Sequence, residues 1–119
     1  MSRTDAHRLG DIVERVAAIR RAEAALLAAE NRRDSEAVEL AFDAILYDLV
    51  VIGEAVKGLT PALRESRSEV PWSEVAGIRD VLTHHYFRVS TEIVRASLDK
   101  PLEDLLLACT ELLEQESIG

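Results

Sequence analysis

One short segment of the chain holds most of the side chains suited to chemistry. It contains three of the five aromatic residues and a group of polar ones: Trp72, Arg79, Asp80, Thr83, His84, His85, Tyr86 and Phe87. Histidine titrates near neutral pH, and arginine presents a fixed fork of donors to phosphate oxygens. The residue types in this segment therefore suit proton transfer beside a bound anion.

Two features of the same segment limit what it can do. Adjacent side chains on a helix point about 100° apart, so His84 and His85 would not chelate one ion together. No pair of carboxylates is spaced for acid–base catalysis, so we expect neither a metal nor a cofactor. The alternative interpretation is structural: a helix end packs its aromatic side chains into the core and leaves the polar ones in water.

Two charged residues interrupt an apolar stretch upstream, in the sequence IGEAVK. Glu54 and Lys57 are three residues apart, and the simplest interpretation is that they pair on a helix surface. In the functional alternative, Glu54 orients a residue of the polar segment or Lys57 contacts phosphate. We expect Asp80 to be solvated or salt-bridged, not a catalytic base.

Three other residues are predicted to be structural. Trp72 follows a proline and is expected to anchor the core, with base stacking as the minority alternative. His7 is expected on the surface. Cys109 lies among leucines and should behave as a small core residue.

The elements that position these residues are predicted to be helices throughout. Only five Gly and three Pro interrupt the chain, and no alternating apolar–polar run suggests a strand. A first helix starts near Thr4 or Asp5, either of which can be its N-cap, and the stretch 22–30 continues it or forms a short second helix. Further helices are expected over 35–58, from Pro61, over 72–86, from Ser90 or Thr91, and from Leu102 after an interruption at 99–101. The prediction is one domain over residues 1–119, an all-α antiparallel bundle of four to five main helices.

The helix over 35–58 has the clearest periodicity. Apolar residues spaced 4 and 3 apart form a heptad seam: Val38, Phe42, Ile45, Leu49, Ile52, Val56 and Leu59. A second row, which includes Gly53, widens the apolar face. A helix apolar over so wide an arc packs on more than one neighbour, or also forms a dimer seam.

Composition excludes several classes of protein. The net charge of the chain is −8, whereas residues 61–100 hold six basic and six acidic residues and are neutral overall. If the protein binds an anion, we expect the anion to bind in this window, where the negative charge is weakest. A single cysteine excludes a disulfide-built module. There is no apolar run long enough to span a membrane and no signal-peptide core, and a transit peptide is not expected, so a cytoplasmic location is predicted.

The segment GIRDVLTHHYF resembles the HepT-like toxins of the HEPN superfamily, whose motif is R-x4-H-x-Y. Three stretches extend the resemblance over the C-terminal two-thirds of the chain: VVIGEAVKGLTPALRE, EVPWSEVAGIRDVL and HHYFRVSTEIV. Two positions depart from the family, which often has Gly and Asp where this chain has Arg88 and Ser90. That departure puts in question the turn after the motif and the RNA contacts there.

The resemblance implies a HEPN-like helical ribonuclease that works as a homodimer. It would be the toxin of a type VII-like toxin–antitoxin pair, neutralised by an MNT-type nucleotidyltransferase. By position, Arg79 and His84 would be the catalytic pair and Tyr86 the residue that the antitoxin adenylylates. Glu54, Lys57, Asp80 and His85 are possible supporting residues. Adenylylation would place an anion near Arg79, where it would pair with the cation that substrate needs.

Helix geometry adds a constraint to this interpretation. Arg79 and His84 are five residues apart, hence about 140° apart around a regular helix. Either the helix ends or loosens near Thr83–Phe87, or the site is completed across a dimer interface. We hypothesise a dimeric cleft with both copies of the pair near the two-fold axis.

Two other functions remain open at the level of sequence. The chain could be a catalytically inactive helical dimer that binds a nucleotidyltransferase, which its net charge of −8 slightly favours. It could also be a nucleotide-binding helper subunit that does not cleave RNA.

Overall fold

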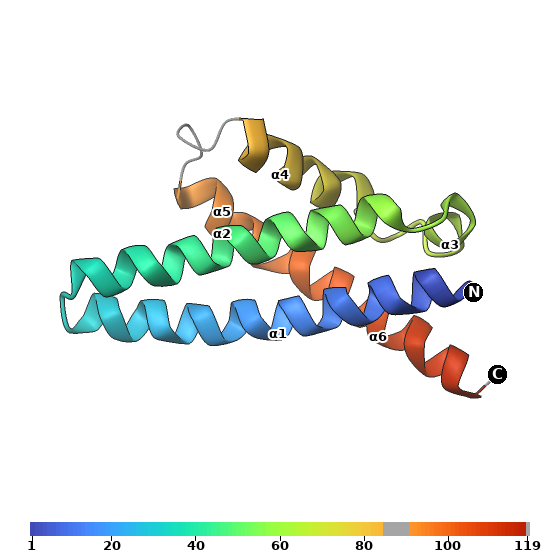
Figure 1. The fold of residues 1–119 in the computed structure, drawn as a ribbon, viewed down its shortest axis with the longest axis horizontal. Coiled ribbons are helices and arrows are strands. Elements are labelled where there is room, and N and C mark those ends of the chain that lie inside the picture. The colour runs from blue at the N-terminus through green and yellow to red at the C-terminus, as the bar shows by residue number, and fades with distance from the viewer. Residues whose placement is uncertain (85–90, 119) are drawn as a thin grey trace.

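The structure, a computed structural model, describes residues 1–84 and 91–118. Over these residues the regular elements are all helical and follow the order α1 (Arg3–Asn31), α2 (Ser35–Gly58), α3 (Pro61–Ser66), α4 (Trp72–His84), α5 (Thr91–Ser97) and α6 (Lys100–Ile118). Figure 1 shows α1 and α2 as a long antiparallel hairpin, with α4 on one side of α2 and α6 crossing the hairpin. The predicted all-α bundle is confirmed, with four longer helices and two short ones in the described part.

The start of the first helix differs from the prediction. Ser2 is the N-cap of α1, because its hydroxyl accepts the amide of Asp5 at 3.0 Å. Thr4 and Asp5 lie inside the helix instead. The stretch 22–30 continues α1 rather than forming a helix of its own, and α1 ends at Asn31.

The bounds of α2 match the prediction. Asp34 caps it by accepting the amide of Ala37 at 3.1 Å, and the helix ends at Gly58. The seam residues from Ile45 to Leu59 are buried, whereas Val38 and Phe42 are partly buried. Because α2 packs on both α1 and α4, its wide apolar face has two neighbours within one chain.

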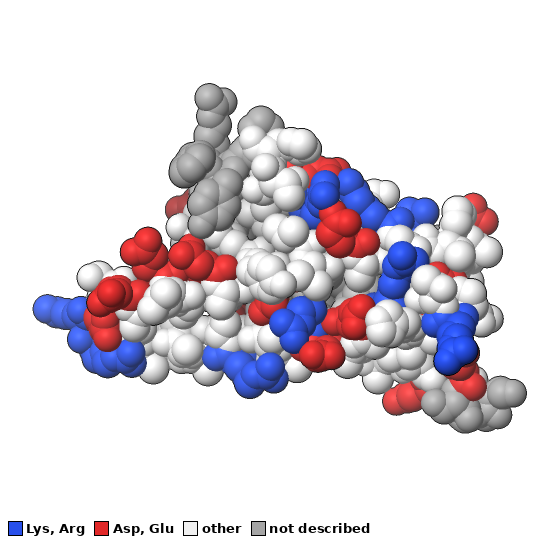
Figure 2. Space-filling model, in the orientation of Figure 1, with Lys and Arg blue, Asp and Glu red and all other residues white. Residues whose placement is uncertain are grey.

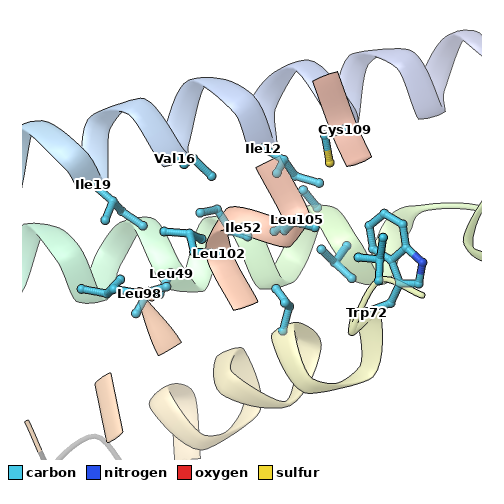
Figure 3. Packing of buried hydrophobic residues seen from close by; sticks show 14 of the residues in the cluster. Ile12, Val16, Ile19, Leu49, Ile52, Trp72, Leu98, Leu102, Leu105 and Cys109 are labelled. Carbon is cyan, nitrogen blue, oxygen red and sulfur yellow. The ribbon is translucent and has the colours of Figure 1, made fainter. Parts of the chain in front are cut away.

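The core lies between the α1–α2 hairpin, α6 and the start of α4 (Figure 3). Trp72 is buried as predicted, and its indole N–H donates to the carbonyls of Arg64 and Arg67 at 3.1 and 3.0 Å. These bonds fix the start of α4 to α3. Cys109 is fully buried, and burial raises the pKa of its thiol to about 12, so it is a core residue as expected.

The last two helices join close to the expected place. The interruption predicted at 99–101 lies at Leu98–Asp99, and α6 begins at Lys100. Pro101 is in the first turn of α6, where the missing amide hydrogen costs no helical bond. Arg20 of α1 donates to the carbonyl of Leu98 at 2.9 Å and so ties this junction to the hairpin.

Over the described residues, no helix combines the length and the apolar composition that crossing a membrane requires. His7 is on the surface as predicted, where its imidazole lies 3.6 Å from Asp11.

A buried carboxylate connects the two ends of the hairpin. Asp5 of α1 is 2% exposed and accepts both the amide (3.0 Å) and the hydroxyl (2.7 Å) of Thr60, the residue before α3. Arg8 donates to the carbonyl of Gly58 at 2.7 Å, one turn away. Burial by itself would raise the pKa of Asp5. The two bonds from Thr60, the bond with Ser2 and the charge of Arg8 together outweigh burial, so the pKa lies below the usual value of 3.8.

This carboxylate predicts an acid-sensitive part of the fold. A group whose pKa is lower in the folded state stabilises the protein above its unfolded pKa, and that stability is lost as the pH falls through the folded value. We expect Asp5→Asn to be less stable than wild type at pH 7, by about 1–3 kcal/mol. The difference should shrink below pH 4, as measured by urea unfolding across pH. A difference that stays constant between pH 7 and pH 2 would contradict this role of Asp5.

Gly77 should accept a side chain with a gain in stability. It lies inside α4, and a Cβ built there has no heavy atom within 4 Å. Glycine in a helix interior is about 0.5–1 kcal/mol less favourable than alanine. Gly77→Ala should therefore raise the midpoint of urea unfolding, as should Gly10→Ala in α1, where the space is also open. A lower midpoint for Gly77→Ala would show that α4 needs glycine there.

Candidate active site

Arg79 occupies the middle of α4 and faces α2. Its side chain is 26% exposed, and its Nη1 donates to Asp80 Oδ1 at 3.1 Å. Its Nη2 forms an ion pair with Glu54 of α2. The Nε atom is buried and has no hydrogen-bond partner. The guanidinium is therefore held between two helices, and a ligand would reach it through its two terminal nitrogens.

The predicted surface pair between Glu54 and Lys57 is wrong. Glu54 pairs with Arg79, and Lys57 pairs with Asp80, so both side chains reach across to α4. Asp80 is salt-bridged as expected. The bond from Lys57 and then that from Arg79 lower the pKa of Asp80, which keeps the carboxylate ionised and makes it a weak base.

Two cations and two anions form a compact charge cluster between α2 and α4. Its members are Arg79, Lys57, Glu54 and Asp80. Figure 2 shows charges of both signs gathered over this part of the molecule, whereas acidic groups predominate over the N-terminal half of α2. The cluster sits at the surface, since its carboxylates are about half exposed. It can present one guanidinium to an anion without adding net charge to the acidic molecule.

His84 is exposed and is the last described residue of α4. It follows Arg79 by five positions, so the two side chains leave the axis about 140° apart. Arg79 points toward α2 while the imidazole of His84 is open to solvent. Thr83 stabilises this last turn by donating its hydroxyl to the carbonyls of Arg79 (2.9 Å) and Asp80 (3.2 Å).

The remaining predicted site residues, His85 and Tyr86, lie outside the described residues, as do Arg88 and Ser90. The expected loosening of the helix between Thr83 and Phe87 also falls mainly there. The described part of the candidate site therefore consists of Arg79, His84, Glu54, Asp80 and Lys57. Within residues 1–84 and 91–118, no three histidine, cysteine or acidic side chains gather as metal ligands would.

One residue at the site was not singled out from the sequence. Gly53 belongs to the second apolar row of α2 and lies directly beneath Arg79: a Cβ built on it would be 2.2 Å from the Cβ of Arg79. A glycine inside an otherwise apolar helix is a signal of close approach that the sequence does carry.

An exposed apolar row on α2 leads to the charge cluster. Leu40 and Tyr47 are 67% and 65% exposed, Ala44 between them is exposed, and Val51 is partly buried. Spacings of 4, 3 and 4 place these residues on one helix face. Glu54 continues the row by three positions and is the partner of Arg79. Large apolar side chains this exposed commonly mark contact surfaces.

The comparison with known families identifies the chain. The family model for HepT-like ribonucleases, described as "Ribonuclease HepT-like", matches residues 11–112. The match takes in every described site residue, from Glu54 to His84. The chain therefore belongs to the HepT-like family, as the motif R-x4-H-x-Y predicted.

Individual relatives agree with that assignment. The chain is 42% identical over 73 residues to a candidate RNase, TTE0752, of Caldanaerobacter subterraneus, an alignment that covers 61% of this chain and 65% of the relative. It is 32% identical over 62 residues to a candidate ribonuclease HepT of Thermococcus cleftensis, covering 52% and 56%. The matched stretches thus span about one half to two thirds of these relatives. No solved structure matches the chain significantly.

Proposed function

We propose that this protein is a ribonuclease that cleaves RNA phosphodiesters with Arg79 and His84 and needs no metal. The observation that carries the proposal is the arrangement of α4 in a HepT-like chain. Its arginine, Arg79, is fixed by two carboxylates at the surface, and the histidine five positions on, His84, is open to solvent. The relatives whose names denote ribonucleases support the same activity.

Each side chain has a distinct part in the proposed reaction. The imidazole of His84 moves a proton to or from the reacting oxygens, because histidine can act as acid or base. The guanidinium of Arg79 stabilises the charge that grows on the phosphoryl oxygens. Glu54 and Asp80 hold that guanidinium in place, and Lys57 holds Asp80. Their role is to position Arg79 rather than to exchange protons.

The direct test is cleavage of RNA by the purified protein in the presence of a metal chelator. We expect defined products from wild type, and cleavage at least about 10²-fold slower by a variant that carries both Arg79→Ala and His84→Ala. Cleavage by wild type that stops on chelation would refute the metal-free mechanism. Equal cleavage by wild type and the double variant would show a contaminating nuclease.

The proposed active form is a homodimer that brings two copies of the pair together. Two observations support this proposal. Arg79 and His84 diverge around α4, and the exposed residues Leu40, Ala44 and Tyr47 form a row that continues through the partly buried Val51 to Glu54. A second copy seated on that row would bring its own α4 toward the same surface. An isologous contact of this kind is the commonest arrangement of homodimers.

Mixing two inactive variants tests whether the site is shared between copies. A mixed dimer contains one Arg79→Ala chain, which keeps His84, and one His84→Ala chain, which keeps Arg79. If the site is built across the interface, one of its two copies then has both native side chains. If the site lies within one chain, each copy lacks one of them. Recovery of activity on mixing is therefore expected. A mixture as inactive as its parts would place the site within one chain, and a monomer by sedimentation at micromolar concentration would refute the dimer.

We further propose that the protein is the toxin of a pair, silenced when an MNT-type nucleotidyltransferase adenylylates Tyr86. The motif supports this proposal, because Tyr86 follows Arg79 by seven positions and an adenylyl phosphate there could pair with the guanidinium that RNA requires. Mass spectrometry after co-expression should show the added adenylyl group on Tyr86. If Tyr86→Phe is tolerated as well as wild type in the presence of the antitoxin, the proposal fails.

A second candidate function is a catalytically inactive dimer that binds the nucleotidyltransferase. The net charge of −8 favours it, because an acidic body repels RNA. Expression without a partner separates the two functions. Growth arrest by wild type that is lost in Arg79→Ala and His84→Ala supports the ribonuclease, and equal harmlessness of all three chains supports the inactive partner.

A further inference from the structure

Gly53 lies where α2 and α4 approach each other closely, at the position of Arg79. A Cβ on residue 53 would be 2.2 Å from the Cβ of Arg79, 3.0 Å from its Cγ and 3.3 Å from its Cα. The nearest of these atoms is the Cβ of Arg79, whose position the backbone sets, so a change of rotamer could not relieve the contact. Any larger residue at position 53 must move α4 away from α2.

One stretch of α2, residues 53–57, contains both the glycine that lets α4 approach and the charged side chains that hold Arg79 and Asp80. Glu54 follows Gly53 directly and pairs with Nη2 of Arg79, and Lys57 lies one turn further on and pairs with Asp80. Asp80 in turn accepts from Nη1 of Arg79 at 3.1 Å. The pairs can form in this way because α4 lies close against α2 at residue 53. The spacing between the helices therefore decides where the guanidinium is fixed.

We propose that Gly53 is a positioning residue for Arg79, and through it for the substrate phosphate. The inference rests on the proposed function, since it assigns Arg79 to the phosphoryl oxygens. Moving α4 outward separates Arg79 from Glu54. It also shifts the guanidinium of Arg79 relative to α2 and to an RNA strand bound there. A displacement of about 1 Å in a positioned catalytic group can lower the rate roughly 10²-fold.

Kinetics of Gly53→Ala test the proposal, with Gly10→Ala as the matched control because a Cβ on Gly10 meets nothing within 4 Å. Both variants are assayed at a temperature where circular dichroism shows them fully folded. We expect Gly53→Ala to lower kcat at least about tenfold, and the KM for the same RNA strand to change less than about twofold. Gly10→Ala should keep the wild-type kcat. A folded Gly53→Ala protein with wild-type kcat overturns the inference.

Stability measurements separate failure of this inference from failure of the proposed function. Gly53→Ala should lower the midpoint of urea unfolding, and the loss should be smaller in an Arg79→Gly background, where the clashing Cβ is absent. If wild type does not cleave RNA, the ribonuclease proposal fails. The difference in stability loss between the two backgrounds still measures the contact between residues 53 and 79. An equal loss in both backgrounds overturns the positioning of Arg79 by Gly53, even where Gly53→Ala is too unstable to assay for cleavage.

Discussion

Replacing His84 by alanine is expected to lower the rate of RNA cleavage by about 10²–10⁴-fold, the range that general acid–base catalysis contributes. His84 is the exposed histidine at the end of α4, and the carboxylate nearest to Arg79 on the same helix, Asp80, is kept ionised by Lys57 and Arg79. Asp80 is therefore a poor substitute for the imidazole in proton transfer. Single-turnover cleavage of a defined RNA strand measures the loss.

The matched control for this variant is His7→Ala, because His7 is an exposed histidine on α1, a helix that supplies none of the site residues. Its rate of cleavage should equal that of wild type. Both variants should keep the stability of wild type within about 0.5 kcal/mol, as exposed substitutions commonly do. A His84→Ala protein that is folded and cleaves at the wild-type rate would remove the imidazole from the mechanism.

Replacing Arg79 by lysine is expected to lower the rate by about 10²–10³-fold, the usual cost of removing one donor that stabilises the transition state. Lysine keeps the positive charge but lacks the planar fork, so one ammonium cannot hold Glu54 and Asp80 and also present two donors to a phosphate. The same single-turnover assay measures the effect. Loss of activity with retained charge would show that geometry matters more than charge at this position.

Arg15→Lys is the control for the arginine variant, because Arg15 has a similar environment away from the site. Its side chain is 28% exposed against 26% for Arg79, and it also pairs with two carboxylates, Asp48 at 3.1 Å and Glu14 at 3.0 Å. Both substitutions should change stability to a similar extent, and only Arg79→Lys should slow cleavage. Equal rates for the two variants would mean that Arg79 is a structural ion-pair residue.

The helices could be predicted because their signals are local. The seam from Val38 to Leu59 predicted α2, and Pro61 and the proline before Trp72 predicted the starts of α3 and α4. The start of α1 could not be fixed in this way. Ser2, Thr4 and Asp5 are all competent caps, and Asp5 is engaged by Thr60, which lies 55 positions along the chain.

The residues of the candidate site were only partly predictable, because their pairing depends on contacts between helices that are distant in the sequence. The motif indicated Arg79 and His84, but the spacing of Glu54 and Lys57 suggested a pair within one helix. The crossing of α4 over Gly53 decides the pairing instead, because it places Arg79 and Asp80 within reach of both. A one-dimensional pattern holds no information on which helices cross, and so the role of Gly53 emerged only from the fold.

The wide apolar face of α2 had two explanations at the level of sequence. Packing on α1 and α4 accounts for most of it, since the seam residues from Ile45 onward are buried within one chain. Leu40 and Tyr47 are not covered by either neighbour. The dimer therefore remains a prediction with a defined surface, and the mixed-dimer experiment addresses it.

The rate of cleavage of one defined RNA strand by wild type, Arg79→Ala, His84→Ala and the double variant tests most directly whether the two side chains act on one phosphodiester. Groups that act as a unit give losses that do not multiply, so the double variant should be about as slow as the slower single variant. Single variants that cleave as fast as wild type, or a double variant whose loss equals the product of the two single losses, would contradict the shared site.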